Sequence, residues 1–276
     1  MTYKCFDLEV GKGIAHLRFS RPDALNSMIP EFWRELPLAV DELERAAGVR
    51  VIVISSTGRH FCSGMDLSVF QGGANLSTGT ALDRERMRRL VLKLQESFNC
   101  LEECRVPVIA AVQGGCIGAG VDMVSACDFR YATTSAFFCI QEVNLAMMAD
   151  LGTLQRLPRL IPEGIARELA YTGDRLDAER AKTCGLVNET FNSEPAMLEH
   201  VMSVAKRIAV QSPLAVASSK AAMNYARDHS ISDSLRQAAE LQAACFDTEQ
   251  LQECMQAKKE KREPVFPDLH AAPAGI

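Results

Sequence analysis

Apolar and polar residues follow two different periods along this chain. Alternation with a period of two, typical of strands with one buried face, runs through residues 6–10 and 14–19 and predicts a hairpin. Unbroken apolar runs indicate strands buried on both faces, and they occur at residues 51–56 and 107–112. Two shorter apolar runs predict further strands, over residues 129–132 and 136–140.

Apolar positions spaced three to four residues apart predict helices elsewhere. Some of these helices alternate with the strands, and they cover residues 29–46, 82–103 and 121–126. From residue 165 the pattern is helical throughout, with helices expected over residues 194–210, 213–228 and 231–246. Alternation of strand, loop and helix indicates an α/β fold.

By this pattern the chain divides into a core over residues 1–193 and a helical C-terminal region over residues 194–276. The C-terminal helices have no strand of their own to cover, so their apolar faces should pack on the core or on another subunit. A segment rich in glycine, serine and threonine, residues 72–80, predicts a mobile surface loop.

The composition narrows the class of protein. The 276 residues are 47% hydrophobic and 24% charged, as in one large globular domain, and the net charge of −5 gives no footprint for nucleic acid. No apolar run reaches the roughly 18 residues that a membrane span needs. The strand pattern begins at residue 6 without a leader, and residues 273–276 form no peroxisomal signal. We therefore expect a cytoplasmic protein without membrane insertion.

The cysteines point to thiols and not to disulfides or metal. The ten cysteines include no CxxC pair, and most lie in apolar runs, as Cys116, Cys127 and Cys139 do. This usage is typical of buried, reduced thiols. The five histidines show no ligand spacing with them, so no metal site is expected.

Three carboxylates stand in apolar or glycine-rich surroundings. Asp122 follows a glycine-rich segment, Glu142 comes twenty residues later, and Asp150 ends the largely apolar run over residues 143–149. Such surroundings disfavour the charged form, which suits proton transfer. The alternative is a structural role without chemistry, in which Asp122 stands at a helix N-cap or in the first turn and Asp150 caps a loop.

Two loops could each offer a backbone N–H group to the same developing oxyanion. One contains Ser63-Gly64-Met65, and the other is Gly118-Ala119-Gly120 at the start of the helix that carries Asp122. Glycine lets a backbone approach a ligand closely, and a helix N-terminus favours negative charge. The chain has no GxGxxG, GxxxxGK[ST] or GxSxG motif, which excludes the common nucleotide-phosphate loops and the nucleophile elbow.

Five segments in this order resemble successive signatures of the enoyl-CoA hydratase/isomerase (crotonase) superfamily. They are Arg21-Pro22-Asp23-Ala24-Leu25-Asn26, Phe61-Cys62-Ser63-Gly64-Met65-Asp66-Leu67, Gly118-Ala119-Gly120-Val121-Asp122, Ala126-Cys127-Asp128-Phe129-Arg130 and Gly152-Thr153-Leu154-Gln155-Arg156-Leu157-Pro158. The resemblance implies a crotonase-like spiral of ββα units with a helical C-terminal trimerisation region, assembled as a homotrimer or homohexamer. It also implies an acyl-CoA substrate, of which coenzyme A is a part, and no separate cofactor.

The resemblance implies that the backbone N–H groups of Met65 and Ala119 bind the thioester carbonyl oxygen. The substrate-binding residues it implies are Phe61, Cys62, Ser63, Gly64, Met65 and Ala119. Many relatives place a basic residue near the CoA phosphates where this chain has Asp23. Arg59 and Lys261 are therefore the candidates for phosphate contacts here.

The three carboxylates together resemble the branch that converts Δ3,5- to Δ2,4-dienoyl-CoA. That branch implies that Asp150 removes the proton at C2 and that protonated Glu142 delivers one at C6. Asp122 would hydrogen-bond to Glu142 and keep it protonated. An enoyl-CoA hydratase or another acyl-CoA isomerase of the superfamily remains an alternative, since one scaffold hosts several reactions. A non-catalytic acyl-CoA-binding or RNA-associated scaffold is the alternative of another class.

Overall fold

The computed structural model describes residues 2–66, 68–71 and 78–272. Of the loop expected over residues 72–80, residues 72–77 lie outside the described residues. Leu67 of the second motif and the C-terminal residues 273–276 lie outside them as well. Within the described part of the chain, no helix combines the length and the apolar character that crossing a membrane requires.

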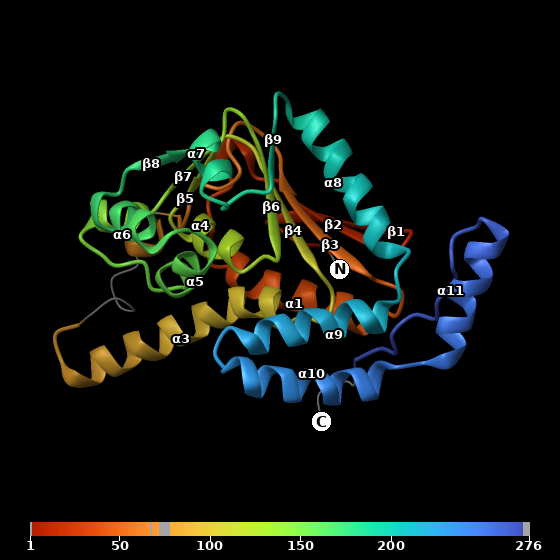
Figure 1. Cartoon of the computed structure of the whole chain (residues 1–276). Coiled ribbons are helices and arrows are strands. Elements are labelled where there is room, and N and C mark those ends of the chain that lie inside the picture. The colour runs from red at the N-terminus through yellow and green to blue at the C-terminus, as the bar shows by residue number, and fades with distance from the viewer. Residues whose placement is uncertain (1, 67, 72–77, 273–276) are drawn as a thin grey trace.

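A six-stranded mixed sheet forms the centre of the molecule, with the order β1-β2-β3-β4-β6-β9 (Figure 1). The strands are β1 (Phe6–Gly11), β2 (Ile14–Phe19), β3 (Val51–Ser56), β4 (Val108–Val112), β6 (Phe129–Thr133) and β9 (Glu189–Phe191). The hairpin of β1 and β2 is antiparallel and the remaining pairs are parallel. The carboxyl ends of β3, β4 and β6 therefore share one edge, where α/β folds place their ligands.

A smaller sheet extends the fold beyond that edge. It has the order β5-β7-β8 and consists of β5 (Gly115–Ile117), β7 (Phe137–Cys139) and β8 (Arg175–Asp177). Because β5 follows β4 and β7 follows β6 after a few residues, the two segments that leave the large sheet lie side by side. The helix after β5 and the turn after β7 consequently begin next to each other.

The described part of the chain also forms helices, some of which cover the two faces of the large sheet. They are α1 (Phe32–Arg45), α2 (Ser68–Gln71), α3 (Ala81–Glu103), α4 (Ala119–Ser125), α5 (Thr153–Leu160), α6 (Glu163–Thr172), α7 (Ala178–Thr183), α8 (Glu194–Ala209), α9 (Pro213–Ala226), α10 (Ile231–Cys245) and α11 (Thr248–Glu260). Two single turns of 3-10 helix are η1 (Pro22–Ala24) and η3 (Gln141–Leu145).

Strand β3 shows how the sheet divides the core. All six of its residues are buried, as the unbroken apolar run predicted. Ile52 and Ile54 join the cluster that includes α1 and α3, whereas Val51 and Val53 join the cluster beneath α8. Since successive strand residues face opposite sides, this run stabilises two cores at once.

Helix α8 corrects one expectation from the sequence. Its range matches the predicted helix, but the expectation that it lacks a strand to cover was wrong. Met197, Val201 and Ala205 are fully buried against the sheet, in a cluster with residues of β2, β3, β4 and β6. The helices without such a partner are α9, α10 and α11, and Figure 1 shows α11 projecting away from the sheet. A division of the chain at residue 194 stays a prediction.

Buried Lys220 anchors the C-terminal helices to the core. Its ammonium group, on α9, lies 3.0 Å from Asp128 Oδ2 and donates to the carbonyl oxygens of Leu101 and Val106, each at 2.9 Å. Asp128 Oδ2 also accepts the N–H of Val108 at 2.7 Å, at the start of β4. A buried cation is tolerated here because a carboxylate and two carbonyls replace its water.

Replacing Lys220 by methionine should lower the free energy of unfolding by about 3 kcal/mol, because it leaves the Asp128 carboxylate without its partner. Urea denaturation followed by circular dichroism measures this loss. The exposed Lys258 of α11 offers a matched control, and Lys258→Met should change stability by less than about 0.5 kcal/mol. A loss below about 1 kcal/mol for Lys220→Met would contradict the anchoring role.

Candidate active site

The loop that carries Met65 lies directly against the start of α4. Gly64, one residue earlier, has a φ of +88°, and a Cβ atom there would lie 2.9 Å from the carbonyl oxygen of Ile117. The same Cβ position is 3.7 Å from the backbone nitrogen of Ala119. Only glycine permits this approach, and it brings the two candidate oxyanion donors to adjacent positions.

Residues 26–28 hold this loop in place. Asn26 Nδ2 donates to two carbonyl oxygens of residues 57–60, at 2.7 and 2.9 Å. The backbone of Met28 donates to Gly64 O at 2.8 Å and accepts from the residue after Met65 at 3.0 Å. The N–H of Met65, between these two bonds, has no acceptor among the described residues. It is therefore available to a ligand.

Ala119 opens helix α4, and its N–H group lies at the helix N-terminus. The preceding Gly118 has φ 54° and ψ −123°, a conformation that turns the chain from β5 into the helix. The first N–H groups of a helix have no partner within it, and no acceptor for the Ala119 N–H is found in the described part of the chain. It is thus a second available donor near the loop that carries Met65, and a shared role of the two groups in an oxyanion hole stays a prediction.

Two of the predicted substrate-binding residues lie beneath the site and not in its wall. Phe61 and Cys62 are fully buried, and Phe61 packs on Phe19 in the core. Their N–H groups already donate to the carbonyls of Gln113 and Gly115. Burial and backbone pairing make Phe61 and Cys62 a support for the loop. Contact with a substrate stays a prediction for these two residues, as it does for Ser63, Gly64, Met65 and Ala119.

Asp122 lies in the first turn of α4 with only 1% of its surface exposed. Its Oδ1 atom accepts the backbone N–H of Thr153, the first residue of α5, at 2.6 Å. Burial raises the pKa of Asp122 to about 6, and the charge of Asp150 adds to the rise, while the hydrogen bond from Thr153 opposes it. The first-turn position agrees with the structural explanation, but the carboxyl group binds a different helix.

Glu142 lies in the turn η3, directly beside the entry to α4. A Cβ atom on Gly118 would lie 3.1 Å from Glu142 Oε1, so the glycine leaves room for the carboxyl group. Its Oε2 atom is buried without a hydrogen-bond partner among the described residues. Burial raises the pKa of Glu142 to about 7, with further increases from the charges of Asp122 and Asp150. This carboxyl group holds its proton near neutral pH.

The hydrogen bond expected between Asp122 and Glu142 is not formed. Asp122 Oδ1 instead accepts from Thr153, because the side chain points to the N-terminus of α5. Glu142 Oε2 has no hydrogen-bond partner in the described part of the chain. Asp122 therefore acts on Glu142 through its charge: when Asp122 is ionised, it raises the pKa of the neighbouring carboxyl group.

Asp150 is half-buried, and burial raises its pKa. The apolar run that precedes Asp150 is largely exposed. Residues 143–148 are open to solvent, and only Ala149 is buried. The exposed side chains include Leu145 and Met148, with 48% and 64% of their surface accessible. An exposed apolar surface thus adjoins the three carboxyl groups.

The two candidate phosphate-binding cations lie apart within one chain. Arg59 is exposed on the loop after β3. Lys261 is exposed at the end of α11, which Figure 1 draws at the opposite side of the molecule from α4 and α5. Contact of either residue with CoA phosphates stays a prediction.

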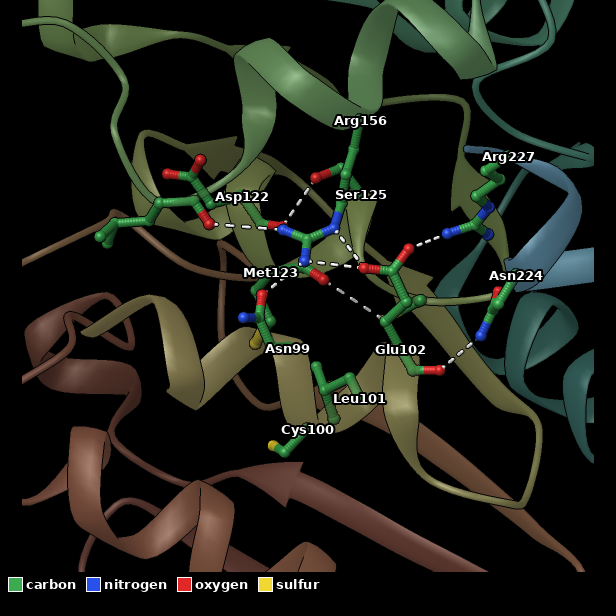
Figure 2. A network of polar contacts seen from close by, with 12 residues as sticks. Asn99, Cys100, Leu101, Glu102, Asp122, Met123, Ser125, Arg156, Asn224 and Arg227 are labelled. Atoms are coloured by element: carbon green, nitrogen blue, oxygen red, sulfur yellow. Dashed lines mark hydrogen bonds and ion pairs between the residues drawn. The ribbon is translucent and has the colours of Figure 1, made fainter. Parts of the chain in front are cut away.

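A polar network behind the site was not predicted from the sequence. Figure 2 shows Arg156 of α5 between Asp122 and Glu102, with Asn99 below it. Arg156 Nε donates to Glu102 Oε2 at 2.9 Å, and its Nη2 donates to Asn99 Oδ1 at 2.7 Å. Glu102 also pairs with Arg227 at the C-terminus of α9. The available signal was the spacing of three between Asn99 and Glu102, which places both on one face of α3.

Comparison with known proteins places the chain among acyl-CoA enzymes. A family model described as enoyl-CoA hydratase/isomerase matches residues 9–269. The peroxisomal Δ(3,5)-Δ(2,4)-dienoyl-CoA isomerase of Arabidopsis thaliana is 39% identical over 274 residues, covering 97% of this chain and 99% of that protein. The mitochondrial Δ(3,5)-Δ(2,4)-dienoyl-CoA isomerase of Homo sapiens is 39% identical over 255 residues, covering 91% and 78%.

The crystal structure of an enoyl-CoA hydratase from Bacillus anthracis matches with a TM-score of 0.87 and 30% identity, covering 96% of this chain and 99% of that one. The two isomerases above are named for the peroxisome and the mitochondrion, which are different compartments. The cytoplasmic location expected from the sequence stays a prediction.

The raised pKa of Glu142 predicts how stability depends on pH. The folded protein binds the proton of this carboxyl group more tightly than the unfolded chain, where the pKa is 4.5. The stabilisation is therefore complete below about pH 4.5 and is lost as the pH rises through 7. Glu142→Gln should increase the free energy of unfolding at pH 8 by on the order of 1–2 kcal/mol and change it little at pH 5.

Urea titrations at both pH values measure this difference. Glu199→Gln, on the exposed face of α8, is the matched control and should change the free energy of unfolding by less than about 0.5 kcal/mol. An equal effect of Glu142→Gln at pH 5 and pH 8 would mean that the carboxyl group titrates normally.

Proposed function

Because the chain belongs to the enoyl-CoA hydratase/isomerase family, we propose that it is an isomerase converting 3,5-dienoyl-CoA to 2,4-dienoyl-CoA. The fold expected from the sequence is confirmed as an α/β crotonase fold with a mixed sheet and C-terminal helices. The observation that carries the proposal is the set of three neighbouring carboxyl groups with raised pKa values, together with two nearby N–H groups that have no acceptor among the described residues.

Proton removal begins the proposed reaction. The thioester oxygen of the substrate accepts the N–H groups of Met65 and Ala119, and the Asp150 carboxylate removes a proton from C2. The electrons of the broken C–H bond spread over the diene and the thioester as a dienolate. Each N–H donor of an oxyanion hole typically stabilises such an anion by roughly 3–4 kcal/mol.

Proton delivery completes the proposed reaction. Glu142 gives its proton to C6, so that double bonds remain at C2 and C4 and no atom is gained or lost overall. Its pKa of about 7 suits a general acid at neutral pH. Asp122, with a pKa of about 6, ionises first, and its negative charge favours the protonated form of Glu142. Two separated acid–base groups fit a reaction that moves a proton along a chain of carbons.

The acyl chain has an apolar surface to bind. The side chains of Val143, Leu145, Met147 and Met148 are all more than a third exposed beside Glu142. Removing this apolar surface from water stabilises a bound hydrocarbon by about 25 cal/mol for each Å² buried. This segment is therefore the proposed wall of the acyl pocket.

Hydration of a 2-enoyl-CoA is the second candidate reaction, since the similar structure from Bacillus anthracis is that of an enoyl-CoA hydratase. A hydratase adds water to the double bond, so its product gains the mass of one water molecule. An isomerase leaves the mass of the CoA ester unchanged and alters only its ultraviolet absorbance spectrum. The remaining alternative, a scaffold without catalysis, would bind CoA esters or RNA and turn over neither substrate. Mass spectrometry and direct binding assays separate the three.

Assembly into a homotrimer or homohexamer completes the proposal. Apolar side chains are exposed along α9, α10 and α11, among them Met223 (72%), Ile231 (81%) and Leu235 (66%). These three line a groove of about 320 Å³ between α9 and α10. Soluble monomers seldom expose contiguous apolar surface of this kind, so a second copy of the chain is the proposed occupant.

Asp150→Asn should lower kcat for a 3,5-dienoyl-CoA by about 10²–10⁴, because it removes the proposed general base. The KM should change only a few-fold, since the CoA ester is held elsewhere. Absorbance of the conjugated product measures the rate. Asp174→Asn, at an exposed position, should keep wild-type kinetics. Near-normal turnover by Asp150→Asn would place the base at another residue.

Light scattering on the purified protein tests the assembly. The expected mass is near three or six times the 30.2 kDa of one chain. Leu235→Glu, which places a charge in the α9–α10 groove, should reduce that mass, whereas Glu199→Gln on α8 should not. A wild-type mass near 30.2 kDa would exclude the assembly and leave the proposed chemistry unaffected.

A further inference from the structure

The short segment from Asp150 to Thr153 carries two groups of the proposed site. The Asp150 carboxyl group is the proposed base, and the Thr153 N–H binds Asp122 at 2.6 Å. The segment precedes α5 and has no regular secondary structure before Thr153. Its first two carbonyl oxygens are held by side chains: Gln95 Nε2 donates to Asp150 O at 2.6 Å, and Arg156 Nη1 donates to Leu151 O at 3.4 Å.

The guanidinium group of Arg156 lies against the backbone of this segment. Gly152 has a φ of +129°, and a Cβ atom there would lie 1.9 Å from Arg156 Nη1. A side chain at this position would displace the guanidinium group, and the φ angle itself favours glycine, so Gly152 permits the close approach of Arg156. The segment therefore depends on Arg156 on one side and on Gln95 on the other.

Helix α3 fixes both of these side chains. Gln95, Asn99 and Glu102 are spaced by four and three residues and lie on one helical face. Gln95 contacts the segment directly, while Asn99 and Glu102 accept from Arg156 at 2.7 and 2.9 Å. Figure 2 shows that Glu102 in turn contacts Asn224 and Arg227. These contacts around Arg156 and Gln95, which we call the brace, therefore continue into α9.

We propose that Arg156 and Gln95 are positioning residues for the proposed isomerisation. They hold the Asp150–Thr153 segment against the polar face of α3, and they thereby fix where the Asp150 carboxylate meets C2 of the substrate. This inference rests on the proposed function, and it adds residues that touch neither the substrate nor the reacting atoms.

Arg156 has an additional effect through its charge. The titratable groups that act on Asp122, or on which it acts, are Cys116 from β5, Glu142 from η3, Asp150 from the loop and Arg156 from α5. Arg156 is the one cation among them and lowers the pKa of Asp122. Its loss should leave Asp122 protonated to higher pH. Gln95 is uncharged and makes no such contribution, which allows the two effects to be separated.

Steady-state kinetics with a 3,5-dienoyl-CoA test the positioning role. Arg156→Gln and Gln95→Met should each lower kcat, by up to roughly 10²-fold, while KM changes less than about threefold, because a small displacement of a catalytic group slows the reaction without removing substrate contacts. The pKa of the Asp122 carboxyl group, followed by carbon-13 NMR, should rise in Arg156→Gln and stay in place in Gln95→Met. Arg159→Gln is the control on α5, since Arg159 pairs with Asp228 and donates to the carbonyl oxygen of Arg227 but makes no bond to the Asp150–Thr153 segment.

Hydrogen exchange of the ligand-free protein tests the brace without relying on the reaction. Peptides covering residues 150–157 should exchange faster in Arg156→Gln and Gln95→Met than in wild type and Arg159→Gln. If wild type fails to isomerise the diene, the proposed function falls and this measurement still decides the brace. Unchanged exchange in both variants, or equal losses in kcat and binding, would overturn the positioning role.

Discussion

The site depends on one buried carboxyl group. Asp122 is almost inaccessible, and a single hydrogen bond from the N-terminus of α5 satisfies its Oδ1 atom. That bond joins the helix carrying one proposed oxyanion donor to the segment carrying Asp150. The charge of Asp122 also raises the pKa of Glu142, whose Oε2 atom has no hydrogen-bond partner within the described residues. The Asp122 side chain thus affects both the position of the segment carrying Asp150 and the protonation of Glu142.

The rest of the fold makes this arrangement possible. Parallel β3, β4 and β6 send the Met65 loop, α4 and η3 from one edge of the sheet, so segments far apart in sequence meet. Glycines at 64 and 118 remove the side chains that would separate them. Helix α3 braces the segment before α5, and the buried Lys220 keeps α9 against the same core. The contacts that stabilise the fold therefore continue into the contacts that position the candidate site residues.

Much of this could be predicted from the sequence. The unbroken run at Val51–Ser56 predicted a fully buried strand, and the predicted C-terminal helices match α8, α9 and α10 to within two residues. Local pattern could not reveal contacts between distant segments. It therefore missed that α8 covers the sheet and that Asp122 binds Thr153 and not Glu142. The apolar pattern before Asp150 also left the exposure of residues 143–148 open, because hydrophobicity alone does not separate a buried segment from an exposed one.

The central claim is that one carboxyl group removes a proton and a different one returns it. The most direct measurement follows 3,5-dienoyl-CoA in deuterated water with Glu142→Gln. The account predicts that deuterium still enters C2, because Asp150 and the two N–H donors remain, while no 2,4-dienoyl-CoA forms. Loss of both exchange and isomerisation would assign Glu142 to the first proton removal and contradict the proposed division of roles.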